Sequence, residues 1–374
     1  MGSRLAVGAA LVLVVAALAF PRAPTERTEP RWQELSRLDA PRAHLQAVAL
    51  ATGEIMVVGG LDPESTGIVR NTTELIDPRT GRATRVEGAH VGRIDPKLST
   101  LPSSGLVVAT GGSEWTGAGW VQVATTELFD PWTKHWLDSR PMHHARADHG
   151  AAVLRDGRLV VAGGHMGPRM LDTVEIFDPI RERWSTAAPL PKPRQLFAMT
   201  AILDGRILVA GGLEWPGVPS KTSLYYDPNA NAWTEGPKLL VERVLHTTVA
   251  LKGGDVLLIG GQRAAAGTAE RFDFRRRAFV HAGTLELPRM LAQAALLEDG
   301  RVLVVGGLPR PASARFEPTG SAELYDPMAN SWRTLPSIAE GSAFGGLVTT
   351  EFGAVLIAGA GDDEQALDRV VRFQ

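Results

Sequence analysis

The sequence predicts an all-β protein, a seven-bladed β-propeller with four-stranded antiparallel blades that is closed by the N-terminal strand completing the last blade. Three observations predict this fold: a Gly-Gly pair that returns about every 50 residues, a second turn marked by Asp-Pro, and half a blade at each end of the chain. A repeat of this length with turn residues at fixed places is typical of propellers and solenoids.

The glycine repeat defines the first two strands of each unit. Another glycine stands six residues before every pair, and Asp precedes it in three copies, as in Asp156-Gly157. Asp-Gly between two apolar runs predicts a tight hairpin, because that turn needs a positive φ. Strand two therefore runs from this turn into the Gly pair. The pairs begin at Gly59, Gly111, Gly163, Gly211, Gly260 and Gly306, with a degenerate seventh copy at Gly359-Ala360.

The third and fourth strands follow a loop of variable length. Strand three ends in Asp-Pro in five copies, the first at Asp77, and Asp-Pro favours a second turn. An aromatic residue stands six positions after the turn Asp in the next five copies, where the first copy has Ala83. We expect these aromatics to begin strand four and to pack between neighbouring blades. They are Trp136, Trp184, Trp233, Phe279 and Trp332.

The two ends of the chain each supply an incomplete blade. Trp32 to Leu35 resembles a strand four with no blade before it, and Val370–Gln374 resembles a strand three with no strand four after it. Pairing the two segments removes the free sheet edge between the first and last blades. We therefore expect residues 31–374 to form one seven-bladed domain.

The N-terminus predicts export. Arg4 precedes the uncharged apolar run Leu5 to Phe20, and Ala17-Leu18-Ala19 offers a small-x-small cleavage pattern. We expect residues 1–19 to be a signal peptide or, if they are not cleaved, an N-terminal anchor that is the chain's only membrane contact. Residues 20–30, rich in Pro and charge, are expected to be a flexible linker. The localisation is then periplasmic, cell-surface or secreted.

The composition excludes several classes of site. The 39 Lys+Arg residues nearly balance the 41 Asp+Glu residues, and no basic run offers a surface for nucleic acid. The sequence contains no cysteine, so disulfides, thiolate metal sites and cysteine nucleophiles are excluded. We expect a monomer without a cofactor.

The repeated Gly-Gly, Asp-Pro and Trp positions resemble the kelch repeat of galactose-oxidase-like propellers and of many protein-binding kelch domains. The resemblance covers about residues 31–374, and it implies the fold much more strongly than a function. Copper-radical oxidases of this kind need a cysteine cross-linked to a tyrosine, which this chain lacks. Exported mutarotase-like kelch propellers acting on sialic acid are similar in outline, but no catalytic motif can be matched to residues of this chain.

A regularly spaced set of arginines precedes the Gly pairs by seventeen or eighteen residues. In a four-stranded meander, the start of strand one and the loop between strands two and three lie on the same face, so these arginines would ring the mouth of the central channel. They form either an anion-accepting rim or structural pairs with glutamates three residues before the turn Asp. Blade four has Leu224 at the glutamate position, which would leave its arginine without that partner. The set comprises Arg42, Arg93, Arg146, Arg194, Arg243 and Arg289, with Ser342 at the seventh position.

The loops after the Gly pairs carry tryptophan. Blade two has Glu114-Trp115 and then Trp120, and blade four has Glu214-Trp215. An indole face that stacks on a sugar, beside a carboxylate that accepts hydroxyl hydrogens, would suit a glycan. The alternative is that each Trp folds over the edge of its own blade.

Histidine is concentrated in blade three. His149 is a candidate ligand-binding residue, and His144, Asp148, His149 and His165 are weak candidates for a metal site, because imidazoles with a carboxylate bind divalent ions. Their spacing fits no fixed ligand pattern, and histidines in such places are more often ordinary surface residues.

Three functional hypotheses follow. The first is an exported, non-enzymatic module that binds a glycan or an acidic peptide or protein on the face formed by the strand-one starts and the loops after the Gly pairs. The second is an enzyme acting on a small sugar at the channel mouth. The third is a structural surface protein.

Overall fold

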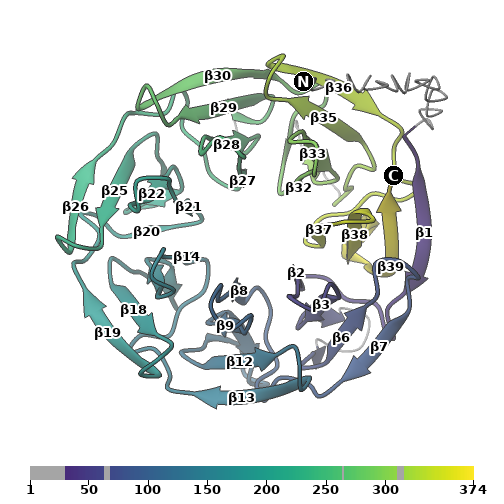
Figure 1. Ribbon diagram of the computed structural model, residues 1–374, viewed down its shortest axis with the longest axis horizontal. Helices are drawn as coiled ribbons and strands as arrows, with labels where there is room; N and C mark the ends of the chain where they lie inside the picture. The colour runs from purple at the N-terminus through teal and green to yellow at the C-terminus, as the bar shows by residue number, and fades with distance from the viewer. Residues whose placement is uncertain (1–29, 63–67, 263–264, 310–315) are drawn as a thin grey trace, which may run out of the picture.

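The computed structural model describes residues 30–62, 68–262, 265–309 and 316–374, which form a closed ring of seven four-stranded antiparallel sheets (Figure 1). Each sheet is one blade, with its first strand nearest the centre of the ring and its fourth strand on the outside (Figure 1). The predicted fold is confirmed. The predicted signal peptide or anchor and the linker lie outside the described residues, apart from Pro30.

Four blades come from the N-terminal part of the ring. Blade one contains β2 (Gln46–Ala49), β3 (Ile55–Val58), β6 (Thr73–Ile76) and β7 (Ala83–Val86). Blade two contains β8 (Lys97–Thr100), β9 (Val107–Thr110), β12 (Thr126–Asp130) and β13 (His135–Ser139). Blade three contains β14 (Gly150–Val153), β15 (Leu159–Ala162), β18 (Val174–Asp178) and β19 (Arg183–Ala187). Blade four contains β21 (Ala198–Ala201), β22 (Ile207–Ala210), β25 (Ser223–Asp227) and β26 (Ala232–Glu235).

Three blades complete the ring. Blade five contains β27 (Thr247–Ala250), β28 (Val256–Ile259), β29 (Thr268–Asp273) and β30 (Ala278–Thr284). Blade six contains β32 (Gln293–Leu296), β33 (Val302–Val305), β35 (Ala322–Asp326) and β36 (Ser331–Leu335). Blade seven contains β37 (Gly346–Thr350), β38 (Gly353–Ala360), β39 (Ala366–Phe373) and, from the other end of the chain, β1 (Trp32–Arg37).

The hydrophobic core lies between adjacent blades. The second strands are buried along their whole length, because each blade is covered on both faces by its neighbours. Val160 of blade three, for example, belongs to one apolar cluster with Val209 and Tyr226 of blade four. The second strands are therefore continuous apolar runs rich in Val and Ile. They lack the alternation of apolar and polar residues that is typical of a sheet with one face exposed to solvent.

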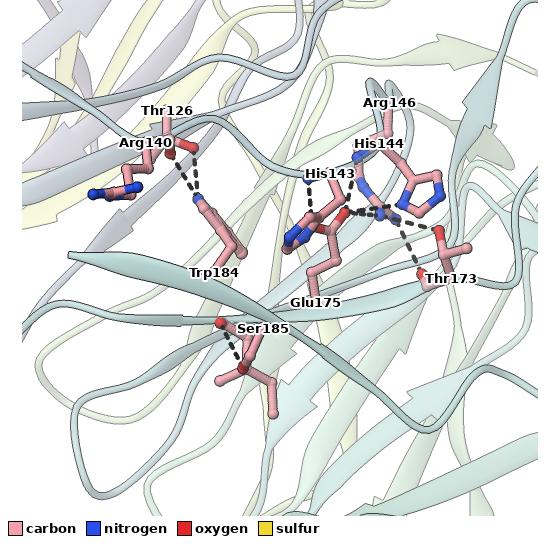
Figure 2. Close-up of polar contacts among 10 residues, drawn as sticks. Thr126, Arg140, His143, His144, Arg146, Thr173, Glu175, Trp184 and Ser185 are labelled. Atoms are coloured by element: carbon pink, nitrogen blue, oxygen red, sulfur yellow. Dashed lines mark hydrogen bonds and ion pairs between the residues drawn. The ribbon is translucent and has the colours of Figure 1, made fainter. Parts of the chain in front are cut away.

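The tryptophans of strand four join each blade to the one before it. Trp136 of blade two donates its indole N–H to Thr73 Oγ1 of blade one at 2.9 Å. Trp184 of blade three donates to Thr126 Oγ1 of blade two at 3.1 Å (Figure 2). Trp332 donates in the same way to the Ala282 carbonyl of blade five at 2.7 Å. The expectation that these aromatics pack between neighbouring sheets is confirmed.

The Gly pairs connect consecutive blades around the ring. In the six Gly-Gly pairs, the N–H of the second glycine donates to the carbonyl of the arginine that begins the next blade, or of Ser342 in blade seven, at 2.7 to 3.1 Å. A Cβ on Gly163, whose φ is +61°, would lie 2.4 Å from the Arg194 carbonyl oxygen. Glycine is therefore required for close approach as well as for backbone conformation.

The ring closes through β1, which pairs antiparallel with β39 (Figure 1). Trp32 lies opposite Phe373, with ring centroids 5.0 Å apart, and the Gly359 N–H donates to the Arg42 carbonyl at 3.3 Å. The predicted joining of the two chain ends is confirmed. In the part of the chain that the structure describes, no helix has the length and apolar character needed to cross a membrane.

Candidate functional site

One face of the propeller, which we call the loop face, is formed by the segments before strand one and the loops after the Gly pairs. These two segments pair directly: Ala43 bridges Leu61, Ala147 bridges His165, and β20 (Arg194–Gln195) pairs with β23 (Leu213–Glu214). The prediction that the two segments share a face is confirmed. Blade six has the same pairing, of β31 (Arg289–Met290) with β34 (Leu308–Pro309). The same face also carries small hairpins: β4 (Leu61–Asp62) with β5 (Ile68–Val69), β10 (Ser113–Trp115) with β11 (Trp120–Gln122), β16 (His165–Met166) with β17 (Arg169–Met170), and β23 with β24 (Val218–Pro219).

All six arginines of the repeat are buried, with relative exposures of 0 to 2%. Each donates one N–H to the carbonyl of the first residue in its own Gly pair, at 2.7 to 3.4 Å. In five blades the guanidinium also pairs with the glutamate of strand three, so the structural pairing that the sequence left open is what the geometry shows. The pairs are Arg42–Glu74, Arg93–Glu127, Arg146–Glu175, Arg243–Glu270 and Arg289–Glu323.

Blade three shows the arrangement most completely (Figure 2). Arg146 donates to Glu175 and to the hydroxyl and carbonyl of Thr173, while Glu175 also accepts the N–H and the imidazole of His143 at 2.7 Å. Burial alone would raise the pKa of Glu175, but the His143 N–H and the Arg146 guanidinium hold that pKa below its ordinary value. Burial in turn lowers the pKa of Arg146. These contacts hold the segment before strand one of blade three against strand three of the same blade.

Blade four is the exception. Arg194 does have a carboxylate partner, which corrects the expectation of an unpaired arginine, but that partner is Glu214 from the loop after the Gly pair, at 2.5 Å. Glu214 also accepts the hydroxyls of Ser220 and Thr222. Glu214 thus takes over the pairing role of the strand-three glutamate; these three bonds all reach its Oε1, while its Oε2 lies 3.6 Å from the Lys192 ammonium.

A ring of seven residues surrounds the propeller axis on the loop face, two positions after each arginine or Ser342; we call it the axial ring. All seven have φ between +50° and +56°, a left-handed conformation that is unfavourable for Leu and Phe. The backbone of one blade binds the next, as where the Asp95 N–H donates to the His44 carbonyl at 3.1 Å. The residues are His44, Asp95, Asp148, Leu196, Leu245, Leu291 and Phe344.

The axial ring has a polar side and an apolar side. On the polar side His44 Nδ1 lies 2.9 Å from Asp95, and His165 Nδ1 lies 3.4 Å from Asp148. Burial would lower the pKa of His44, but Asp95 raises it above its ordinary value. Burial and the nearby Asp95 raise the pKa of Asp148 despite the opposing charge of His165. The sequence analysis identified Asp148 and His165 but not His44 and Asp95. These two residues each stand two positions after an arginine of the repeat, as Asp148 does, and that spacing would have indicated them.

Of the four blade-three metal candidates, Asp148 and His165 are brought together, but His149 and His144 have other partners. His149 is buried, its pKa is far below the ordinary value because of burial, and its Nε2 lies 3.1 Å from Thr110 Oγ1. His144 faces Glu175 instead. Among the described residues, the ligand-type atoms that do gather within 4.8 Å of one another belong to His90, Glu127 and Asp138, a group that the sequence did not predict. In this group, Glu127 already forms an ion pair with Arg93.

The three predicted tryptophans are exposed on the loop face. Trp115 is 45% and Trp120 is 42% exposed, and their rings meet edge to face with centroids 5.5 Å apart in the β10–β11 hairpin. Trp215 in blade four is 63% exposed. The blade-three hairpin touches the blade-two hairpin through the Gly167 N–H, which donates to Gln122 at 2.7 Å. Aromatic surface thus lies on the loops of blades two and four, with blade three between them.

Comparison with known proteins agrees with this architecture. Residues 145–191 match the Kelch motif family. Kelch-like protein 36 of Rattus norvegicus and of Mus musculus is 27% identical over 323 residues, covering 82% of this chain and 42% of each relative. Kelch-like protein terF of Aspergillus terreus is 24% identical over 134 residues, covering 33% of this chain and 29% of the relative. The chain thus spans less than half the length of these relatives.

A solved structure of similar fold is a novel fungal alcohol oxidase of the AA5 family in complex with copper. Its TM-score is 0.73 at 17% sequence identity, and the match covers 92% of this chain and 75% of that one. At this identity the likeness concerns the fold alone. The chain is therefore similar in fold to kelch-repeat propellers, a scaffold on which function depends on the local site.

Proposed function

We propose that this kelch-repeat propeller is an exported binding module that takes a glycan on its loop face. The similarity to kelch proteins supports a binding module. The loops after the Gly pairs are the part of the repeat that differs most in sequence from blade to blade. Export is supported by the charged, then apolar, then small-residue order of positions 1–19.

The observation that carries the glycan proposal is the placement of Trp115, Trp120 and Trp215 on one face, each more than two fifths exposed. Contiguous exposed aromatic surface, as the Trp115–Trp120 pair forms, is typical of binding surfaces, and an indole face stacks well on the C–H face of a sugar ring. Asp95 and Asp148 in the axial ring lie on the same face and would accept sugar hydroxyl hydrogens. The buried arginines no longer support the general anion-accepting rim.

The test is a glycan and peptide array probed with the wild-type protein and with Trp120→Ala. Trp132 is 65% exposed on the β12–β13 turn, at the opposite face, so Trp132→Ala is a matched control for loss of an exposed indole. We expect Trp120→Ala to weaken glycan binding about tenfold, as for loss of one stacked ring, while Trp132→Ala does not. Equal binding by both variants, or binding of peptides alone, would refute the glycan proposal.

Export has its own test. Deleting residues 1–19 should retain the protein inside the cell, whereas the full chain should appear in the envelope or the medium. Fractionation followed by immunoblotting measures this directly. Equal distribution of the two proteins would contradict export through this segment.

A second candidate function is catalysis on a small sugar at the axis, and one observation favours it. Asp148, with its raised pKa, faces His165 in a half-buried site, an arrangement suited to proton transfer. If the wild-type protein interconverts sugar anomers, and Asp148→Asn loses this turnover but still binds the sugar, the protein is an enzyme. Binding without turnover in the wild-type protein would reject this candidate.

A further inference from the structure

Two cavities of the described structure lie where the arginine–glutamate pair of the repeat is incomplete. One, of about 240 Å³, borders Ser342, which replaces the arginine in blade seven. The other, of about 250 Å³, borders Leu224, which replaces the glutamate in blade four. Departures from the repeat thus create open space at positions that other blades fill with a charged group.

Blade five shows what the missing glutamate does. Glu270 accepts the Leu240 N–H at 2.6 Å, the Val241 N–H at 3.2 Å and the Arg243 Nε at 2.8 Å. Its carboxylate therefore occupies the space between the linker and strand three, and it neutralises the guanidinium from that side.

Blade four lacks the strand-three carboxylate in this space. Pro191 and Lys192 stand at the positions of Leu240 and Val241, and Leu224 stands at the position of Glu270. Glu214 reaches Arg194 from the loop after the Gly pair instead. The cavity remains open between the linker, the start of β25 and the end of β26.

The groups around this cavity favour an anion. Lys192, Arg194 and Lys238 line it against the carboxylates of Glu214 and Glu235. Arg194 is 2% exposed, and its buried Nε has no hydrogen-bond partner, as is also true of the Nε of Arg42 and Arg146, whereas the Nε of Arg243 binds Glu270. A buried guanidinium N–H without an acceptor is costly, and a carboxylate is its strongest acceptor.

We propose that the blade-four cavity binds a carboxylate group of the ligand in the place that strand-three glutamates occupy in five other blades. Lys192 and Lys238 attract the group, and it lies beside the Arg194 guanidinium that lines the cavity. Trp215, which is exposed, follows the lining residue Glu214 in the sequence, and its backbone N–H donates to the Pro193 carbonyl at 3.1 Å. This inference rests on the proposed function and narrows its ligand to one that carries a carboxylate, supplied by an acidic sugar or an acidic side chain.

The experiment measures binding of galacturonate, galactose and N-acetylglutamate amide to the purified protein by titration calorimetry. Leu224→Glu restores the repeat's own carboxylate and fills the cavity, and Lys192→Gln with Lys238→Gln removes the attracting charges without touching the core. We expect galacturonate to bind the wild type at least about tenfold more tightly than galactose, the effect of one charge-assisted hydrogen bond. Both variants should lose that preference.

The outcomes separate the two proposals. Equal affinity of the wild type for galacturonate and galactose, or a preference that survives in the double lysine variant, overturns the carboxylate site and leaves glycan binding standing. Loss of all sugar binding in Trp120→Ala concerns the glycan proposal alone. Binding of N-acetylglutamate amide that Leu224→Glu abolishes supports the site and assigns its carboxylate to a peptide. The lysine variant keeps the test valid if Leu224→Glu does not fold.

Discussion

Replacing Arg243 by Ala tests whether the buried arginines hold the fold together or contact a ligand. Arg243 is 0% exposed and donates to the Gly260 and Thr268 carbonyls, to Thr268 Oγ1 and to Glu270. Its removal leaves the Glu270 carboxylate, which is 1% exposed, without its counter-charge. Breaking a buried ion pair on one side costs about 3–5 kcal/mol, so we expect Arg243→Ala to lower the free energy of unfolding by that amount.

Arg194→Ala is the matched comparison. Its partner Glu214 is 12% exposed and keeps Ser220, Thr222 and the Lys192 ammonium, 3.6 Å away, when the guanidinium is lost. We therefore expect a smaller loss of about 1–3 kcal/mol. The double variant Arg243→Ala/Glu270→Leu removes both charges and should be more stable than Arg243→Ala alone, because no unpaired carboxylate remains buried.

Urea unfolding followed by tryptophan fluorescence measures all three variants. The structural interpretation predicts that the midpoint falls most for Arg243→Ala, less for Arg194→Ala, and partly recovers in the double variant. An Arg243→Ala protein that unfolds at the wild-type urea concentration, yet no longer binds glycan, would refute this reasoning and restore the arginines as a ligand-binding rim.

Three further predictions concern closure, the axial ring and the Gly pairs. Trp32→Ala should lower stability by about 2–4 kcal/mol in the same urea assay, because it removes an aromatic contact that joins the chain ends; an unchanged midpoint would contradict closure through β1. Asp95→Asn should lower the pKa of His44, which NMR titration measures. Because Asp95 raises that pKa, the pairing stabilises the fold fully below the unfolded pKa near 6.5, and the stabilisation is lost as pH rises through the folded pKa. A variant in which His44 titrates as in the wild type would disprove the pairing. Gly163→Ala should cost at least about 2 kcal/mol by thermal unfolding, and clearly more than Gly117→Ala, whose added Cβ meets nothing within 4 Å; similar losses would show that backbone conformation alone matters.

The axial ring shows where sequence reasoning stopped short. Its residues are of four types, His, Asp, Leu and Phe, so no single residue type marks the position in all seven blades. Only their shared left-handed backbone, at a fixed offset from the arginines, makes them one feature. Asn and Gly are the residues that suit this conformation best, so the presence of Leu and Phe indicates that the side chains themselves matter at the axis.

The sequence by itself determined the number of blades, the position of each turn and the joining of the chain ends. Those features depend on local chemistry, because Asp-Gly and Asp-Pro favour their turns wherever they occur, and the spacing of the Gly pairs counts the units. The tertiary structure decided which charged groups face solvent. Arg194 finds its carboxylate in Glu214, 20 residues away along the chain, and Arg243 finds its own in Glu270, 27 residues away. Burial arises from blades packed on both sides, so only the assembled ring could show that the arginines are buried and that a cavity lies beside Leu224.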